Sequence, residues 1–309
     1  MVLALGTGCA ADLLPGELVV PGELESSSYR GVQGAALGAA VALDGEALLA
    51  GAPGLGQVWR LDSGAVVQGD DELGRWVWWN QGRPHAAQPL TGVFDISGER
   101  AALLWETPGA IVFAAGWMAD AFRVATATAD GVQLWDEDGT VLARLEQAGV
   151  QQIAIGHERV LLLSCVEAGC EVSAWRPEGA ALELLGSAGD GGAVIEVEGM
   201  AWWGDPQLEH ATGAGRVCAE DGRCIEGIEG DHLGRRLSSS HAAGVFNTWT
   251  VPARLRLAPL DGGPVLAIDR APASRPPALH SQGGSLAVGL PSDGVNGWGE
   301  GRVLVVTLD

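Results

Sequence analysis

Two close cysteine pairs are the residues of this 309-residue chain whose spacing most clearly indicates chemistry. Cys165 and Cys170 enclose four residues, and Cys218 and Cys224 enclose five. Each pair brackets a glycine-containing turn between strand-like runs, so a hairpin would bring its two thiols within reach of a local disulfide. The competing interpretation is a zinc site with four thiolate ligands, but these spacings are wider than in a zinc knuckle. We expect two disulfides, which form in an oxidising compartment.

Histidines and acidic turns give weaker signals. The six histidines are scattered without a metal-protease spacing, and the chain has neither a Gly-x-Ser-x-Gly elbow nor a phosphate loop. The acidic stretches at 136–139 and 220–222 are typical of hairpin turns. We therefore expect no catalytic residue, no metal site and no cofactor.

Tryptophan is the third residue type with a chemical use, since there are 12 tryptophans against one tyrosine and four phenylalanines. Most of these rings should form an apolar core between sheets, because aromatic side chains bury a large area. The alternative is that some of them lie at one rim, where they would stack on sugars or anchor a protein partner. The candidate binding residues are then Trp78, Trp79, Trp202 and Trp203.

The N-terminus, residues 1–15, ends its first apolar stretch in Gly-Thr-Gly-Cys9-Ala-Ala-Asp. It resembles the end of a bacterial lipoprotein signal, in which small residues precede a cysteine that becomes lipidated. This resemblance implies a lipid anchor on Cys9, attached to the outer membrane. The other interpretation is an ordinary exported N-terminus with an incidental cysteine. No later stretch has the ~18 consecutive apolar residues of a transmembrane helix.

The charge balance is strongly acidic, with 39 acidic and 18 basic residues and a net charge of -21. All of the basic residues are arginine. Such a field repels phosphate backbones, which argues against nucleic-acid partners. It keeps a tryptophan-rich surface soluble, and it would also attract cations or a basic partner.

Repeated sequence elements indicate how these residues are positioned. A Leu-Gly step precedes a strand-like run at three places, and an apolar run ending in Gly-x-Pro occurs at three others. Each Gly-x-Pro is followed by a strand that begins with Gly-x-Val. The Leu-Gly steps are at 37–38, 73–74 and 233–234, and the Gly-x-Pro turns are at 51–53, 204–206 and 289–291. Proline ends a strand because it cannot donate to the ladder.

This order resembles the FG-GAP repeat of integrin α-chain propellers and many bacterial surface proteins. Residues 30–62 carry the whole pattern, with Leu37-Gly38, Gly51-Ala-Pro53 and Gly56-Gln-Val-Trp59. Residues 279–308 match its second half, and 200–240 match in fragments. The resemblance implies a β-propeller. It also implies calcium loops of the Asp-x-Asp-x-Asp-Gly type, but the turn at 43–46 is too short and supplies too few carboxylates, so calcium binding is not carried over.

The fold class we predict is all-β, a single propeller domain over residues 16–309 with seven blades of short antiparallel sheets. An early segment, 16–20, should pair with the last blade and close the ring. The alternative is a β-sandwich or a two-domain β protein. The unit boundaries are expected near Tyr29, Ala65, Gly116, Gly149, Gly191, Gly230 and Arg275.

Two functions fit this architecture. The first is a non-catalytic, monomeric binding or scaffold protein of the cell envelope or the extracellular medium, which engages a protein or glycan through rim loops. The second is a propeller hydrolase or lyase acting on an extracellular polysaccharide. Convergence of several carboxylates with perturbed pKa values in a deep channel would favour the enzyme.

Overall fold

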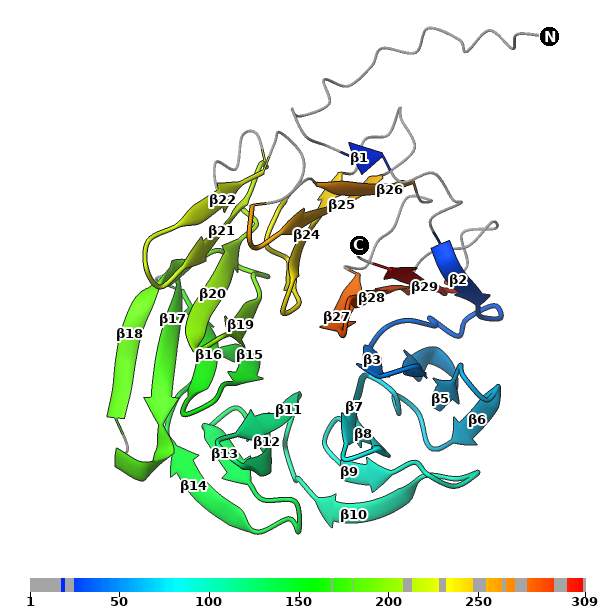
Figure 1. Ribbon diagram of the computed structural model, residues 1–309. Coiled ribbons are helices and arrows are strands. Elements are labelled where there is room, and N and C mark those ends of the chain that lie inside the picture. The colour runs from blue at the N-terminus through cyan, green and yellow to red at the C-terminus, as the bar shows by residue number, and fades with distance from the viewer. Residues whose placement is uncertain are drawn as a thin grey trace, which may run out of the picture.

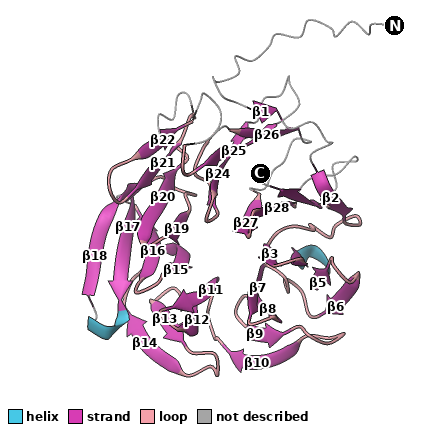
Figure 2. Ribbon diagram, viewed as in Figure 1, coloured by secondary structure: helices cyan, strands magenta, loops and turns pink. Residues whose placement is uncertain are grey.

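The computed structural model describes residues 18–19, 25–167, 169–179, 181–207, 213–227, 232–246, 254–262, 265–269, 277–291 and 299–307. Almost all regular structure in these residues is β-strand, with two single-turn 3-10 helices at Pro53–Leu55 (η2) and Pro177–Gly179 (η3). The strands form small sheets that stand side by side around a central axis (Figures 1 and 2). The prediction of an all-β propeller is confirmed, and the sandwich alternative is wrong. No helix in the described ranges is long and apolar enough to cross a membrane.

Six of the sheets in the described residues have four antiparallel strands each. Five of these follow chain order from the axis outward. They are β3 (Val41–Asp44), β4 (Ala47–Ala52), β5 (Gln57–Arg60), β6 (Ala65–Gln68); β7 (Trp76–Asn80), β8 (Arg83–Gln88), β9 (Gly92–Asp95), β10 (Ala102–Glu106); β11 (Val112–Met118), β12 (Ala121–Ala127), β13 (Val132–Trp135), β14 (Val141–Leu145); β15 (Val150–Ile155), β16 (Val160–Val166), β17 (Gly169–Arg176), β18 (Ala181–Ala188); and β19 (Val194–Val197), β20 (Met200–Asp205), β21 (Arg216–Ala219), β22 (Cys224–Glu226).

The ring is closed by a sheet that joins the two ends of the described chain. It contains β27 (Ala278–Gln282), β28 (Ser285–Leu290), β29 (Arg302–Thr307) and, as its outer strand, β2 (Glu25–Arg30). β2 pairs antiparallel with β29, from Glu25 opposite Val306 to Arg30 opposite Arg302. An N-terminal strand therefore does pair with the last blade, but it is β2 and not the predicted segment 16–20. Closure of this kind protects the sheet edges that an open array would expose.

The remaining sheet differs from the others. It consists of β23 (Arg236–Leu237), β24 (His241–Phe246), β25 (Arg254–Pro259), β26 (Leu266–Asp269) and β1 (Leu18–Val19). β1 pairs with β26 in the parallel sense, which accounts for part of the segment expected to close the ring. The expectation of seven blades of short antiparallel sheets is thus corrected: the described residues show six regular four-stranded blades and one five-stranded sheet of mixed pairing.

Two of the predicted unit boundaries are wrong. Ala65 begins β6 and Gly116 lies within β11, so both fall inside a blade. Gly149 and Gly191 do lie between sheets, where turns separate β14 from β15 and β18 from β19. The boundary at Ala65 was misplaced because the outer strand β6 is short and largely exposed.

The hydrophobic core lies between neighbouring sheets. One cluster joins β12 and β13 to β16 and β17 through fully buried side chains such as Val132, Leu162 and Trp175. Another joins β16 and β17 to β20 and β21. A middle strand is therefore buried on both faces, which explains apolar runs such as Val160–Leu163 that do not alternate with polar residues. Each sheet stabilises the next by covering its apolar face.

The repeated glycines are contacts between successive blades. A Cβ placed on Gly51 would lie 1.7 Å from the carbonyl oxygen of Gly74, so the two backbones touch where side chains would otherwise stand. Gly74 has a φ of 89°, a conformation that glycine adopts without strain. The same contact joins the Gly-x-Pro turn to the next Leu-Gly step in two further places, Gly204 with Gly234 and Gly289 with Gly38. The repeats found in the sequence therefore set the spacing of the blades.

Candidate functional site

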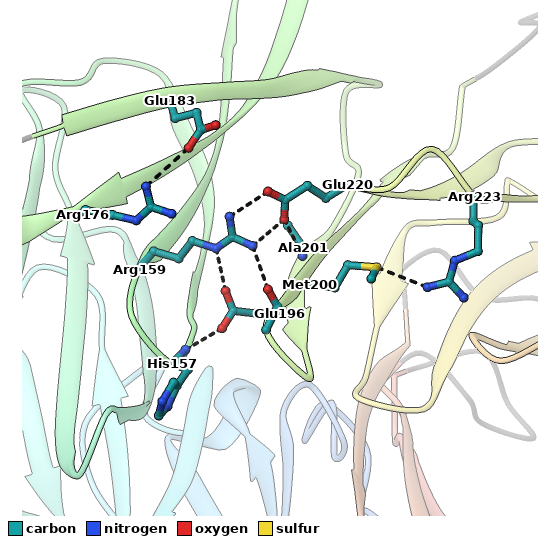
Figure 3. A network of polar contacts seen from close by, with 10 residues as sticks. His157, Arg159, Arg176, Glu183, Glu196, Met200, Ala201, Glu220 and Arg223 are labelled. Carbon is teal, nitrogen blue, oxygen red and sulfur yellow. Dashed lines mark hydrogen bonds and ion pairs between the residues drawn. The ribbon is translucent and has the colours of Figure 1, made fainter.

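An open hollow of about 490 Å³ lies where the turns of two neighbouring blades meet. The turn between β15 and β16, the turn between β19 and β20, and the turn between β21 and β22 all contribute to it. Its lining residues are His157, Glu158, Arg159, Arg176, Glu196, Glu198, Gly199, Met200, Glu220 and Asp221. Figure 3 shows that the side chains of Glu196 and Glu220 point toward Arg159.

Arg159 is the centre of the polar network. Its side chain is only 7% exposed, and its Nε donates to Glu196 at 2.7 Å. Its Nη1 and Nη2 donate to the two carboxylate oxygens of Glu220, and Nη2 also donates to the carbonyl oxygen of Gly199 at 3.1 Å (Figure 3). The guanidinium group thus links turns from two blades through charge-assisted hydrogen bonds.

The backbone holds the two carboxylates in place. The amide of His157 donates to Glu196, and the amide of Ala201 donates to Glu220 at 3.2 Å. The turn before β16 is closed by a 2.8 Å hydrogen bond from the Gly156 amide to the Arg159 carbonyl. A Cβ on Gly156 would lie 2.4 Å from the carboxyl carbon of Glu196, so glycine leaves room for that carboxylate.

The electrostatics of the hollow are acidic. Five carboxylates line it against two arginines, and one of these, Arg176, pairs with Glu183 at 3.6 Å outside the lining. Hydrogen bonds with Arg159 lower the pKa of Glu220, and those with Glu220 and Glu196 raise the pKa of Arg159. The backbone amide of Arg223 lowers the pKa of Asp221. Glu220 and Asp221 are thus held in the charged form, which does not suit donation of a proton.

The structure places the four candidate tryptophans away from this hollow, in the packing between blades. Trp78, Trp202 and Trp203 are at most 9% exposed. Trp79 is half-buried and donates from Nε1 to the Ala42 carbonyl at 3.2 Å, whereas the Nε1 of Trp203 donates to Ser187 at 3.1 Å. With so little free ring surface, the three buried residues do not form a binding platform. Trp79 keeps part of its surface exposed, and binding through it stays a prediction.

The two predicted disulfides are present. Cys165 and Cys170 are opposite each other on β16 and β17, and Cys218 and Cys224 are opposite each other on β21 and β22. Each closes the end of a hairpin, as the spacing indicated. The zinc alternative is wrong, because the two pairs form separate bonds. Two disulfides are consistent with folding in an oxidising compartment.

The acidic stretches form the hairpin turns expected of them. The side chain of Asp136 accepts hydrogen bonds from the amides of Asp138 and Thr140 at 3.1 and 2.7 Å, and Asp221 accepts one from the amide of Arg223.

Among the described residues, one group has metal-ligand geometry, Cys165 and Cys170 with Asp190, and its two sulfurs are joined in the disulfide. Cys9, the predicted lipidation site, lies outside the described residues.

Sequence reasoning missed the Arg159 network. A signal was present, since Arg159 directly precedes the buried run Val160–Leu163 and an arginine there must find a partner when the strand is buried. Its partners could not have been identified, because Glu196 and Glu220 are 37 and 61 residues away along the chain.

Comparison with known proteins bears on the fold alone. No family model and no curated protein matches the sequence. The WD40 β-propeller domain of Doa1 superimposes with a TM-score of 0.61 at 12% identity, over 91% of this chain and 98% of that one. The WD40 domain of Toxoplasma gondii coronin gives a TM-score of 0.54 at 12% identity, over 92% and 87%. At such identities, the likeness establishes a propeller and carries no function with it.

Proposed function

We propose that this protein is a non-catalytic, exported binding or scaffold module of the FG-GAP propeller type, which engages a protein partner through the acidic hollow. The observation that carries the proposal is the hollow itself, in which Arg159 holds two carboxylates in place and further carboxylates stand around the opening. A preorganised acidic surface fits a basic segment of a partner, because complementary charge speeds encounter and fixes register.

The repeat architecture supports the FG-GAP assignment. Three copies of the glycine contact coincide with the three Leu-Gly steps and the three Gly-x-Pro turns of the sequence. The two disulfides support export. Together with the lipoprotein-like residues 1–15, they lead us to propose a lipid anchor on Cys9 at the cell envelope. One propeller domain, residues 16–309, follows this anchor. Metabolic labelling with an alkyne fatty acid tests the anchor, and Cys9→Ser should abolish the label.

Catalysis on a polysaccharide is the weaker hypothesis. A glycoside hydrolase needs a carboxylic acid with a raised pKa as its proton donor. In the hollow, the pKa of Glu220 is lowered and both Glu196 and Glu220 bind Arg159. This arrangement supports a structural use of the two carboxylates.

The experiment is a binding titration with the disulfide-bonded protein. A fluorescent, arginine-rich decapeptide and a neutral peptide of equal length are compared by anisotropy at two salt concentrations. The basic peptide should bind more tightly, and Glu158→Gln with Glu198→Gln should weaken its binding at least fivefold. The matched control, Glu46→Gln with Glu106→Gln, removes two charges from exposed positions in two other blades. Equal binding of both peptides, or unchanged binding by the double variant, would reject the hollow as the site. Binding on a glycan array that is the same for the wild type and the double variant would favour a glycan partner.

A further inference from the structure

The outer strand β18 is an unprotected edge of the propeller. It has eight residues and is the last strand of its sheet, at the outside of the ring (Figure 1). The outer strands β6, β10, β14 and β22 have three to five residues each. β18 contains neither proline nor a basic residue, although these are common means by which natural edge strands discourage pairing.

Two leucines of β18 share one face of the sheet and remain exposed. Leu182 is opposite Trp175 on β17, and Leu184 is opposite Ser173. Both leucines therefore lie on the face on which Trp175 packs against the preceding blade. Leu182 is nevertheless 43% exposed and Leu184 63%. The apolar face of this sheet thus extends beyond the area that the preceding blade covers.

The accessible part of the edge is residues 181–185. A β-bulge interrupts the register between Leu184 and Gly186. Beyond the bulge, a Cβ on Gly186 would lie 2.7 Å from the Trp203 ring of the next blade, and Nε1 of Trp203 donates to the Ser187 carbonyl oxygen at 3.1 Å. Before the bulge, alternate residues turn their N–H and C=O groups away from β17, where an added strand can pair with them.

The charge of the edge indicates which partner it suits. Glu183, the one charged residue of β18, lies on the face opposite to the leucines, and its side chain is 56% exposed although it pairs with Arg176 at 3.6 Å. A basic residue of an added strand can therefore approach it, and the net charge of -21 attracts such a strand. A second copy of this chain fits poorly. Two-fold antiparallel pairing that sets Leu182 opposite Leu184 puts Glu183 opposite its own copy, and like charges in that position are destabilising.

We propose that β18 accepts an extended segment of a partner protein as an added strand, in which apolar residues alternate with lysine or arginine. In this mode of recognition, backbone hydrogen bonds supply the affinity and side chains at alternate positions supply the specificity. The apolar residues lie beside Leu182 and Leu184, and a basic residue lies beside Glu183. The edge is made of backbone groups and not of the carboxylates of the hollow, so this proposal does not depend on the proposed function.

The test is an anisotropy titration of the disulfide-bonded protein with a fluorescent, end-blocked nonapeptide in which valine and lysine alternate. Two further forms of the peptide are methylated on the backbone nitrogen of every valine or of every lysine, so they keep the charge but lack opposite sets of amide donors. One form should bind like the parent peptide. The other should bind about tenfold more weakly, because it has lost its hydrogen bonds to β18. Equal binding by the two methylated forms would overturn the proposal.

Protein variants locate the binding. Leu184→Lys should weaken binding of the parent peptide about fivefold, because it places a like charge beside the peptide. The matched control is Leu103→Lys, at another exposed leucine on the outer strand β10, and it should bind like the wild type. Equal weakening by both leucine variants would contradict binding at β18.

The hollow is tested as the competing site for the same peptide. In Glu158→Gln with Glu198→Gln, the difference between the two methylated forms should persist, because it arises from the backbone of β18. Loss of that difference in the double variant would assign the peptide to the hollow and reject strand addition, and it would leave the proposed function intact.

Discussion

Replacement of Arg159 by methionine is the most informative single perturbation of this propeller. The side chains of Arg159 and Glu196 are 7% and 5% exposed, and they are joined by a 2.7 Å ion pair. Arg159→Met keeps much of the side-chain volume but leaves a buried carboxylate without its cation. Breaking a buried ion pair in this way costs about 3–5 kcal/mol. For a domain of this size, that corresponds to a fall in unfolding temperature of roughly 6–10 °C.

A double-mutant cycle distinguishes this cause from simple loss of packing. In Arg159→Met combined with Glu196→Gln, the charge that was left behind is removed as well. The double variant should therefore be more stable than Arg159→Met alone, by about 1–3 kcal/mol. Loss of packing by itself would make the double variant no better than the single one.

The pH dependence gives a second check. Because the pKa of Glu220 is lowered in the folded wild type, its contribution is present above the unfolded value of about 4.3 and is lost as pH falls through the folded pKa. In Arg159→Met, protonation relieves the uncompensated charge instead. The stability difference between wild type and variant should therefore shrink between pH 7 and pH 3.5. Urea unfolding followed by tryptophan fluorescence measures it, and a loss below about 1 kcal/mol at pH 7, or a pH-independent difference, would refute the reasoning.

Three further predictions concern the architecture. Gly51→Ala should destabilise the fold by about 3 kcal/mol or prevent folding, because the new Cβ would lie 1.7 Å from the Gly74 oxygen. The control is Gly179→Ala, whose Cβ would meet nothing within 4 Å and which should change the free energy of unfolding by less than about 0.5 kcal/mol. Equal effects of the two substitutions would contradict the role of Gly51 in blade spacing. Replacement of both Cys218 and Cys224 by serine should lower the free energy of unfolding in urea by about 2 kcal/mol. Peptide mapping under non-reducing conditions tests the pairing itself, and a disulfide between cysteines of different hairpins would refute it. Burial lowers the pKa of His280, whose Nδ1 accepts a hydrogen bond from the Leu43 amide at 3.1 Å. The unfolded chain therefore takes up more protons below about pH 6.5, and the free energy of unfolding should fall from there toward pH 5. His280→Gln should flatten that fall, and an unchanged pH dependence would exclude His280 as its source.

The fold was accessible from the sequence because its signals are local and repeated. Gly51 and Gly74 mark one blade junction by residue type alone, and Cys165 and Cys170 are close in the chain, so a hairpin suffices to pair them. The site was not accessible, because Arg159 and Glu220 come from turns in two different blades and Glu196 from strand β19, and nothing short-range links them. The tryptophans were placed correctly in general, because large rings such as Trp175 and Trp203 pack between neighbouring sheets as expected. Which of them could instead lie at a rim was not accessible, because only the neighbouring sheet decides whether a given ring is covered.

The pairing of β2 with β29 has a consequence for how the molecule is made. The outer strand of the closing sheet, β2, is synthesised before the blades, whereas its partner β29 is synthesised after them. Until β29 is synthesised, β2 has no antiparallel partner while the blades between them form. A chain of this design therefore has an unpaired strand until β29 is in place, and removal of either β2 or β29 would leave the same sheet incomplete.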